Sequence, residues 1–177
     1  MKSNLPKIIL AWYHNHSRDL PWRRYNSFKD KSYKVLVSEF MLQQTQVKTV
    51  IPFFERFIQK LPNIETLSKS KLKTIYNIWQ GLGYYSRARN LLKTAKIIKK
   101  NYKGKIPKDY EILKTLPGIG SYTASAIMAI AHNQNYIGVD ANVERFVSRL
   151  FGLKNSHFNY KEIFLEKLNS IISQNKF

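Results

Sequence analysis

The 177-residue sequence contains no cysteine. This absence excludes a disulfide framework, a thiolate zinc site, a thiol nucleophile and an iron–sulfur cluster held by this chain. Long apolar runs are missing too, and no segment reaches the ~18 residues of a membrane span. The apolar run Ile8–Tyr13 is too short for a signal-peptide core, and no small-residue cleavage site follows it. We therefore expect a cytoplasmic protein.

Acidic residues are scarce, because 11 Asp and Glu stand against 30 Lys and Arg, which gives a formal net charge of +19. No acid lies between Glu65 and Asp109, but twelve bases do: Lys69, Lys71, Lys73, Arg87, Arg89, Lys93, Lys96, Lys99, Lys100, Lys103, Lys105 and Lys108. Such a field attracts phosphate and makes binding depend on salt. Abundant Lys, Ile and Asn are also typical of AT-rich genomes. Charge alone therefore leaves both a nucleic-acid partner and a compositional bias open.

Alternating strand patterns are absent as well, and apolar residues recur with helical spacing instead. The clearest stripe consists of Val143, Phe146, Val147, Leu150 and Phe151. Proline and glycine residues separate such segments. The sequence therefore predicts an all-α protein of about nine or ten short helices.

Residues 113–127 read Leu-Lys-Thr-Leu-Pro-Gly-Ile-Gly-Ser-Tyr-Thr-Ala-Ser-Ala-Ile. One helix is predicted to end before Pro117, a turn to use Gly118 and Gly120, and a second helix to begin near Ser121. Glycines let backbone N–H groups approach an anion, and a helix N-terminus adds positive partial charge. An ordinary αα-hairpin is the alternative. The whole string, however, resembles the helix-hairpin-helix, a motif that binds DNA phosphates.

A single carboxylate, Glu39, interrupts the apolar run Val35–Leu42. On a helix it shares a face with Leu36 and Gln43. Burial there would raise its pKa and keep the acid protonated near neutral pH, ready to donate. The alternative is a structural carboxylate that caps a helix or pairs with a base such as Arg23.

Two further segments suit contact with nucleic-acid bases. The amide-rich patch Gln43–Gln46 offers hydrogen bonds to base edges, although it could equally be a solvated helix end. Residues 81–90, Gly-Leu-Gly-Tyr-Tyr-Ser-Arg-Ala-Arg-Asn, interleave aromatic and basic side chains after a glycine-rich turn. Tyr84 and Arg87 there suit stacking on bases or wedging between them. The alternative is a buried Tyr84–Tyr85 hinge with exposed arginines.

Asp140 precedes the helix with the clearest stripe, in the string Val139-Asp-Ala-Asn-Val-Glu-Arg145. It lies three residues before Val143 and so shares the face of the stripe, which favours acid–base or charge-stabilising chemistry. A helix N-cap is the alternative. No metal site is expected, because the histidines at positions 14, 16, 132 and 157 lack metal-ligand spacing.

Together these segments resemble one family, the adenine DNA glycosylases of the MutY type, within the helix-hairpin-helix superfamily of base-excision enzymes. The matching strings follow the family order and are Leu20–Arg23, Tyr33–Val47, Trp79–Asn90, Leu116–Ala124 and Val139–Val143. Tyr122 separates the chain from bifunctional relatives of the endonuclease III type, in which a catalytic lysine would stand there. A lyase step is therefore not expected.

The resemblance implies roles for the matching residues. Glu39 would protonate the departing adenine, Asp140, oriented by Asn142, would stabilise the oxocarbenium-like sugar, and Tyr122 would assist. Contacts to substrate and DNA are implied for a second set: Trp22, Arg23, Gln44, Tyr84, Arg87, Gly118 and Gly120. In that set, Trp22 and Arg23 would line the adenine pocket. Gln44 and Tyr84 would enter the double helix opposite the lesion, and the two glycines would bind the phosphate backbone.

The resemblance also implies a fold and its limits. A six-helix barrel module is expected over residues 28–134, with the hairpin at about 113–127, and a partial second helical lobe over residues 1–27 and 135–177. Relatives have a shorter segment between Trp22 and Tyr33 and a glycine in place of Ala141. They also continue into cysteines that hold a 4Fe–4S cluster and into a Nudix-like domain that helps to recognise 8-oxoguanine. Without cysteine, this chain is expected to bind no cofactor. A shortened reading frame, a gene fragment and a cluster-free variant are all open.

The sequence thus predicts a monofunctional glycosylase that hydrolyses the N-glycosidic bond of adenine mispaired with 8-oxoguanine or guanine in double-stranded DNA. One alternative is a truncated, catalytically impaired remnant that still binds DNA. A more remote one is a polybasic binder of nucleic acids or membrane surfaces. A monomer is expected, without membrane association, at the nucleoid of a bacterial cytoplasm.

Overall fold

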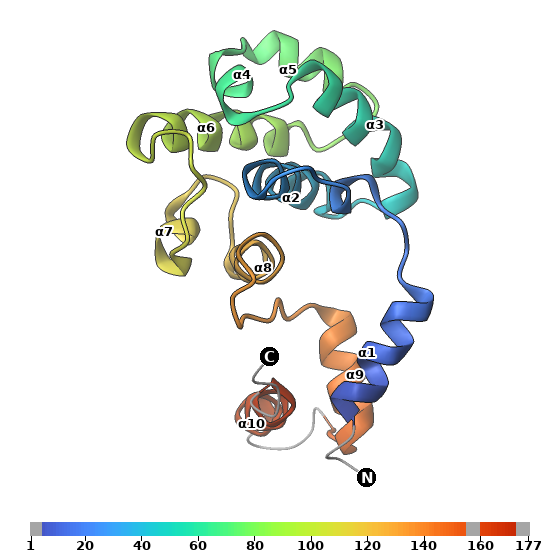
Figure 1. Cartoon of the computed structure of the whole chain (residues 1–177). Helices are drawn as coiled ribbons and strands as arrows, with labels where there is room; N and C mark the ends of the chain where they lie inside the picture. Colours follow the sequence, from blue (N-terminus) through green and yellow to red (C-terminus); the bar gives the residue numbers. More distant parts are fainter. Residues whose placement is uncertain (1–4, 155–159, 173–177) are drawn as a thin grey trace. The chain divides into compact units, whose positions relative to one another are not determined.

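The computed structural model describes residues 5–154 and 160–172 (Figure 1). Within these residues it contains ten α-helices, a 3-10 turn, a π-helical turn and no strand. The predicted all-α fold is confirmed. None of the described helices is long and apolar enough to cross a membrane. His157 lies outside the described residues.

Two compact units make up the chain. The larger unit is Leu20–Gly138, and the smaller unit is Met1–Asp19 with Val139–Phe177. In the larger unit the elements are η2 (Pro21–Arg23), α2 (Phe28–Leu42), α3 (Val47–Lys60), α4 (Ile64–Lys69), α5 (Leu72–Trp79), α6 (Tyr85–Asn101), α7 (Tyr110–Thr115), α8 (Ser121–Ala126) and the π-helical η3 (Ile127–Ala131). The larger unit begins before the expected residue 28, because η2 packs on α2 and α3.

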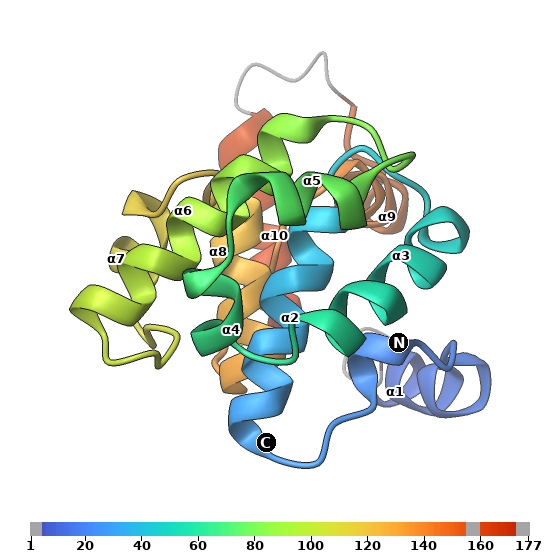
Figure 2. The ribbon, with the colours of Figure 1, turned by 90° about the horizontal axis from the view of Figure 1, so that it is seen from above.

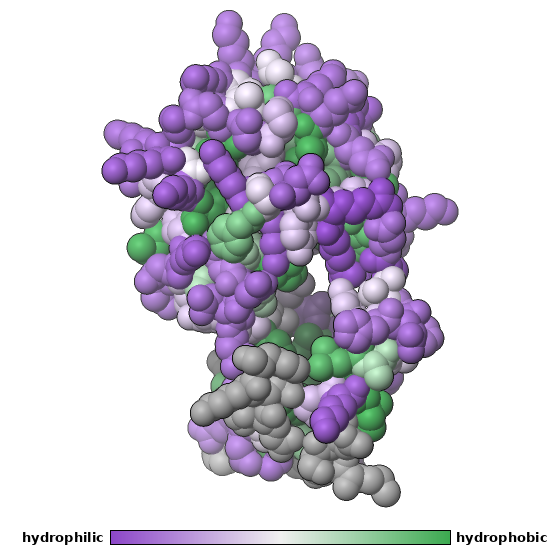
Figure 3. Space-filling model, in the orientation of Figure 1, coloured by the Kyte–Doolittle hydropathy of each residue, from purple (hydrophilic) through white to green (hydrophobic). Residues whose placement is uncertain are grey.

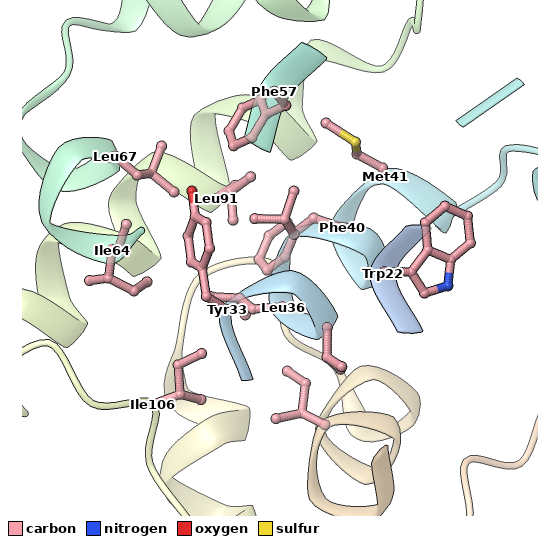
Figure 4. Packing of buried hydrophobic residues seen from close by; sticks show 14 of the residues in the cluster. Trp22, Tyr33, Leu36, Phe40, Met41, Phe57, Ile64, Leu67, Leu91 and Ile106 are labelled. Atoms are coloured by element: carbon pink, nitrogen blue, oxygen red, sulfur yellow. The ribbon is translucent and has the colours of Figure 1, made fainter. Parts of the chain in front are cut away.

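Helix α2 is the centre of the larger unit. It packs against α3, α6, α8, η2 and η3, and Figures 1 and 2 show these helices around it. Ser27 caps its first turn, where the hydroxyl accepts a hydrogen bond from the Asp30 N–H at 3.1 Å. Every residue from Val35 to Met41 is buried. A helix segment that is buried on all sides in this way is packed against neighbours on every face, and Figure 4 shows this core.

The predicted hairpin is present in the larger unit. Helix α7 ends at Thr115, before Pro117, and α8 begins at Ser121. Asp109 caps α7 by accepting a hydrogen bond from the Ile112 N–H at 2.9 Å. The helical path of α8 continues into η3.

The smaller unit contains α1 (Leu5–His16), α9 (Ala141–Phe151) and α10 (Tyr160–Ile172). Its described core consists of Val147, Phe164 and Leu168, because α10 packs on α9. The apolar stripe on α9 is therefore only partly covered. Phe146 is 45% exposed and Leu150 is 38% exposed, and Figure 3 shows hydrophobic residues at the surface of this unit.

Candidate functional site

Glu39 lies in the buried half of α2, and only 8% of its surface is exposed. Among the described residues, no hydrogen bond or ion pair reaches its carboxyl group. Burial raises the pKa of Glu39 to about 7, because a charged carboxylate is poorly solvated there. Pairing with Arg23 does not contribute to this shift. The side chain can therefore hold a transferable proton at neutral pH.

Three turns of the larger unit present backbone or side chains at its surface, and each contains a residue in the left-handed conformation. The Gln44 turn (residues 43–45) follows the end of α2 and places Gln44 at φ +56°. The Tyr84 turn (residues 81–84) precedes α6 and places Tyr84 at φ +48°. The hairpin turn (residues 116–120) joins α7 to α8 and places Gly118 at φ +82°.

The Tyr84 turn does not form the buried hinge that was the alternative for this segment. Tyr84 is 59% exposed and Tyr85 is 41% exposed. The ring of Tyr85 packs edge to face on Tyr76, with 5.3 Å between ring centroids. The Tyr84 side chain is therefore largely exposed at the tip of this turn.

The position of Arg87 corrects the sequence-based expectation that this residue contacts DNA, because only 6% of its surface is exposed. Its guanidinium group donates hydrogen bonds to backbone carbonyls, among them Met41 O at 2.6 Å and Gly83 O at 3.2 Å. These inward-facing donors are not available to a phosphate. The sequence could not reveal this, because Arg87 stands within a long basic segment.

The hairpin turn requires glycine at position 118. A Cβ added there would lie 2.8 Å from the Phe40 ring and 2.9 Å from Asn90 Cβ, and its positive φ also disfavours other residues. Gly120 differs, because its φ is −88° and the space beside it is open.

Two side chains hold the inner side of the hairpin turn. Thr94 Oγ1 donates to Pro117 O at 2.9 Å, and Gln43 Nε2 donates to Gly118 O at 3.0 Å. No sequence motif marks Thr94 as a functional residue. The available signal was a hydroxyl on the face of α6 that Leu91 and Ile98 otherwise make apolar.

The other residues expected near a substrate lie in three places. Tyr122 is in the first turn of α8 and is 44% exposed. Gly138 lies against its ring, since an added Cβ would be 3.0 Å from Tyr122 Cε2. Trp22 is buried against Phe54, with 5.3 Å between ring centroids, whereas Arg23 is exposed.

Asp140 and Asn142 belong to the smaller unit. Asp140 is the N-cap of α9, and its Oδ1 accepts hydrogen bonds from Asn142 N at 2.9 Å and Val143 N at 2.8 Å. Asn142 Nδ2 also donates to Asp140 Oδ2 at 3.1 Å. Partial burial acts to raise the pKa of Asp140, but these hydrogen bonds outweigh it and hold the pKa below its usual value. The carboxylate is therefore ionised at neutral pH.

The basic segment between Glu65 and Asp109 covers much of α4, α5 and α6, and Figure 3 shows hydrophilic residues over this part of the surface. Two of its lysines form ion pairs with Glu65. Lys69 pairs with Glu65 at 2.9 Å, and Lys99 pairs with the same carboxylate. Most of the other bases there are exposed and without an acid beside them in the sequence, so they form a positive surface.

The described residues contain no group of three His, Asp or Glu side chains that could hold a metal ion. The family resemblance implies an iron–sulfur cluster, which is held by cysteine thiolates. Because the chain has no cysteine, its residues do not fit that cluster, and no step of the chemistry is derived through it.

Comparison with known proteins places this chain in a family. The chain matches the family described as "HhH-GPD superfamily base excision DNA repair protein" over residues 37–174. It is 45% identical over 175 residues to an adenine DNA glycosylase of Buchnera aphidicola subsp. Baizongia pistaciae, which is 97% of this chain and 49% of the relative. The human adenine DNA glycosylase is 43% identical over 147 residues, 80% of this chain and 27% of the relative. The chain thus spans about half, or less, of these relatives.

Solved structures show the same fold. A thermostable thymine-DNA glycosylase has a TM-score of 0.82 and 27% identity, and the match covers 95% of this chain and 77% of that one. An endonuclease III–DNA complex has a TM-score of 0.75 and 22% identity, and covers 98% of this chain and 79% of that one. With its hairpin, its buried acid and these likenesses, the chain belongs to the HhH-GPD superfamily of base excision DNA repair proteins.

Proposed function

We propose that this chain hydrolyses the N-glycosidic bond of adenine in double-stranded DNA, where adenine is mispaired with 8-oxoguanine or guanine. The relatives at 43–45% identity carry the name adenine DNA glycosylase. The observation that carries the proposal is Glu39, an unpaired carboxyl group buried in α2 whose pKa is raised to about 7. Such a group is suited to protonate a leaving base.

The chemistry needs an acid and a stabilised sugar cation. As the bond between sugar and adenine breaks, its electron pair leaves with the base, and the Glu39 proton transfers to the adenine ring. The ionised carboxylate of Asp140, held by Asn142, would stabilise the positive charge that develops on the sugar, and Tyr122 would assist in this step. Water then adds a hydroxyl to the sugar and releases a proton. The products are free adenine and an abasic site. Because residue 122 is tyrosine rather than lysine, no amine attacks the sugar and no strand cleavage follows.

The three turns would hold the DNA open during this reaction. A base inside a duplex must leave the stack before its glycosidic bond can be reached. The exposed side chains of Gln44 and Tyr84 would enter the vacated space and compensate for lost stacking. Backbone N–H groups around Gly118 and Gly120 would bind a phosphate, while Trp22 and Arg23 would line the pocket for the base.

The test is single-turnover release of adenine from duplexes that contain A:8-oxoguanine, A:G or A:T. We expect release from the two mispairs and none from A:T. Glu39→Gln should lower the rate by about 10²–10⁴-fold or more, with duplex affinity within a few-fold of wild type. The matched control is Glu111→Gln, which changes an exposed glutamate. Duplex binding without adenine release by wild type would overturn the proposal and indicate a catalytically impaired remnant. Wild-type rates in Glu39→Gln would show that the residue is structural.

A further inference from the structure

The three turns are not independent of one another, although they lie far apart in the sequence. We propose that Arg87 and Gln43 are positioning residues that fix Gln44, Tyr84 and Gly118 in one spatial pattern. This inference rests on the proposed function, in which those turns hold a distorted duplex. In this proposal Arg87 acts from inside the protein, by fixing the turns that touch the DNA, and does not bind a phosphate itself.

The guanidinium group of Arg87 bridges the Gln44 turn and the Tyr84 turn. Its Nη1 lies within hydrogen-bonding distance of four acceptors at the end of α2: Phe40 O at 3.4 Å, Met41 O at 2.6 Å, Gln43 O and Thr45 Oγ1 at 3.0 Å. Its Nη2 donates to Leu82 O at 3.3 Å and Gly83 O at 3.2 Å. A guanidinium group is planar and rigid, so it sets the distance between the two turns.

The same group orients the exposed tyrosine. The Arg87 guanidinium lies over the Tyr84 ring at 5.2 Å and over the Trp79 ring at 5.7 Å. Trp79 Nε1 also donates to Gly83 O at 3.0 Å. Tyr84 is therefore held by a cation–π contact on one side while most of its surface stays exposed.

Gln43 extends the network to the hairpin turn. Its backbone carbonyl accepts from Arg87, and its side-chain Nε2 donates to Gly118 O at 3.0 Å and lies 3.4 Å from Thr123 Oγ1. A continuous polar chain thus runs from Tyr84 through Arg87 and Gln43 to Gly118.

Turns that are fixed in place should matter more for unstacking a base than for the affinity of the protein for the duplex. A surface that is already ordered loses less conformational entropy when it binds, and small displacements of positioned groups can lower a rate strongly. The positive surface on α4, α5 and α6 does not depend on this network. Loosening the network should therefore impair base unstacking far more than duplex affinity.

The test uses Arg87→Lys, which keeps the charge but loses the planar fork, and Gln43→Met, which loses the amide donors. The probe is an A:8-oxoguanine duplex with 2-aminopurine beside the mispaired adenine, whose fluorescence rises when it unstacks. At saturating protein we expect both variants to lose most of the fluorescence rise and to release adenine about 10–100-fold more slowly. Duplex affinity should stay within a few-fold. The double variant should lose little more than the worse single one, because the residues share one network.

The matched control is Tyr33→Phe, which removes another buried hydrogen bond to a backbone carbonyl, from Tyr33 Oη to Leu61 O at 2.6 Å. It should lower the melting temperature without changing the fluorescence rise. If Arg87→Lys and Gln43→Met lower only the melting temperature, the two residues are core residues and the proposal is wrong. Wild-type protein that binds without unstacking would also overturn it. Unstacking by wild type without adenine release would instead overturn the proposed excision and leave the positioning roles intact.

Discussion

Glu39 carries a carboxyl group where a charge is costly to bury. Its pKa rises from 4.5 to about 7 on folding, so the folded state holds this proton more tightly than the unfolded state does. The proton therefore stabilises the folded state fully below pH 4.5, and this stabilisation is lost as the pH rises through about 7. Glu39→Gln should therefore increase the free energy of unfolding, by less than about 1 kcal/mol at pH 5 and by ~3 kcal/mol at pH 8. Urea unfolding at the two pH values measures this gain. Equal stability of variant and wild type at pH 8 would contradict it.

The same proton should govern the rate of excision. If Glu39 is the acid, the single-turnover rate should be constant below pH 7 and fall up to about tenfold per pH unit above it. Asp140 should not add a second transition between pH 5 and 7, because its hydrogen bonds hold its pKa below the usual value. A rate that stays constant from pH 6 to pH 9 would exclude Glu39 as the proton donor.

The burial and orientation of single site residues could be predicted from the sequence in some cases and not in others. The burial of Glu39 follows from its immediate neighbours, because an apolar run surrounds it on α2. The burial of Arg87 does not, because its acceptors Phe40 and Thr45 lie 47 and 42 positions earlier in the chain. Asp140 was placed on the apolar face of its helix, yet its carboxylate turns back to cap the first turn of α9. That choice depends on the local backbone rather than on periodicity.

At the scale of elements, the hairpin turn offers a matched pair of glycines. Gly118→Ala meets both a positive φ and a clash with Phe40 and Asn90, so we expect it to destabilise the larger unit by about 1–3 kcal/mol. Gly120→Ala meets neither obstacle and should change stability by less than about 0.5 kcal/mol. Thermal unfolding measures both variants. Equal melting temperatures would show that the turn relaxes without cost.

The ends of helices could be predicted where proline or glycine interrupts the helical pattern, as at Pro117 and Gly118, because proline and a left-handed glycine end a helix for local reasons. The π-helical turn after α8 could not be predicted, since no proline or glycine marks it. Nor could the exposure of Phe146 and Leu150 on α9. Periodicity identifies the apolar face of a helix, but it does not tell how much of that face a partner helix covers.

At the scale of the whole molecule, the positive surface should dominate DNA affinity. If ~5 phosphates are contacted, the logarithm of the binding constant should fall against the logarithm of salt concentration with a slope of about −4.5. Fluorescence anisotropy with an undamaged duplex between 50 and 300 mM salt, roughly the range over which counterion release is resolved, measures this slope. A slope shallower than about −2 would show that the lysines reflect sequence composition and not a binding surface.

The two units differ greatly in the size of their cores. Among the described residues, three buried apolar side chains form the core of the smaller unit, whereas 31 form that of the larger unit. Buried apolar area supplies most of the favourable free energy of folding. The smaller unit should therefore open at a lower temperature or denaturant concentration than the larger one.

Val147→Ala tests this order and ties it to activity. Val147 is the buried side chain of α9, at 1% exposure. Its truncation to alanine should lower the free energy of unfolding of the smaller unit, which is the first transition, by ~2 kcal/mol. The second transition, that of the larger unit, should stay unchanged. Val37→Ala, a fully buried valine of α2, is the matched control and should lower the second transition. Because Asp140 caps α9, adenine excision should disappear at the first transition, while hydrogen exchange still shows α2 protected. A single transition that both variants shift equally would mean that the two units unfold together and would contradict this prediction.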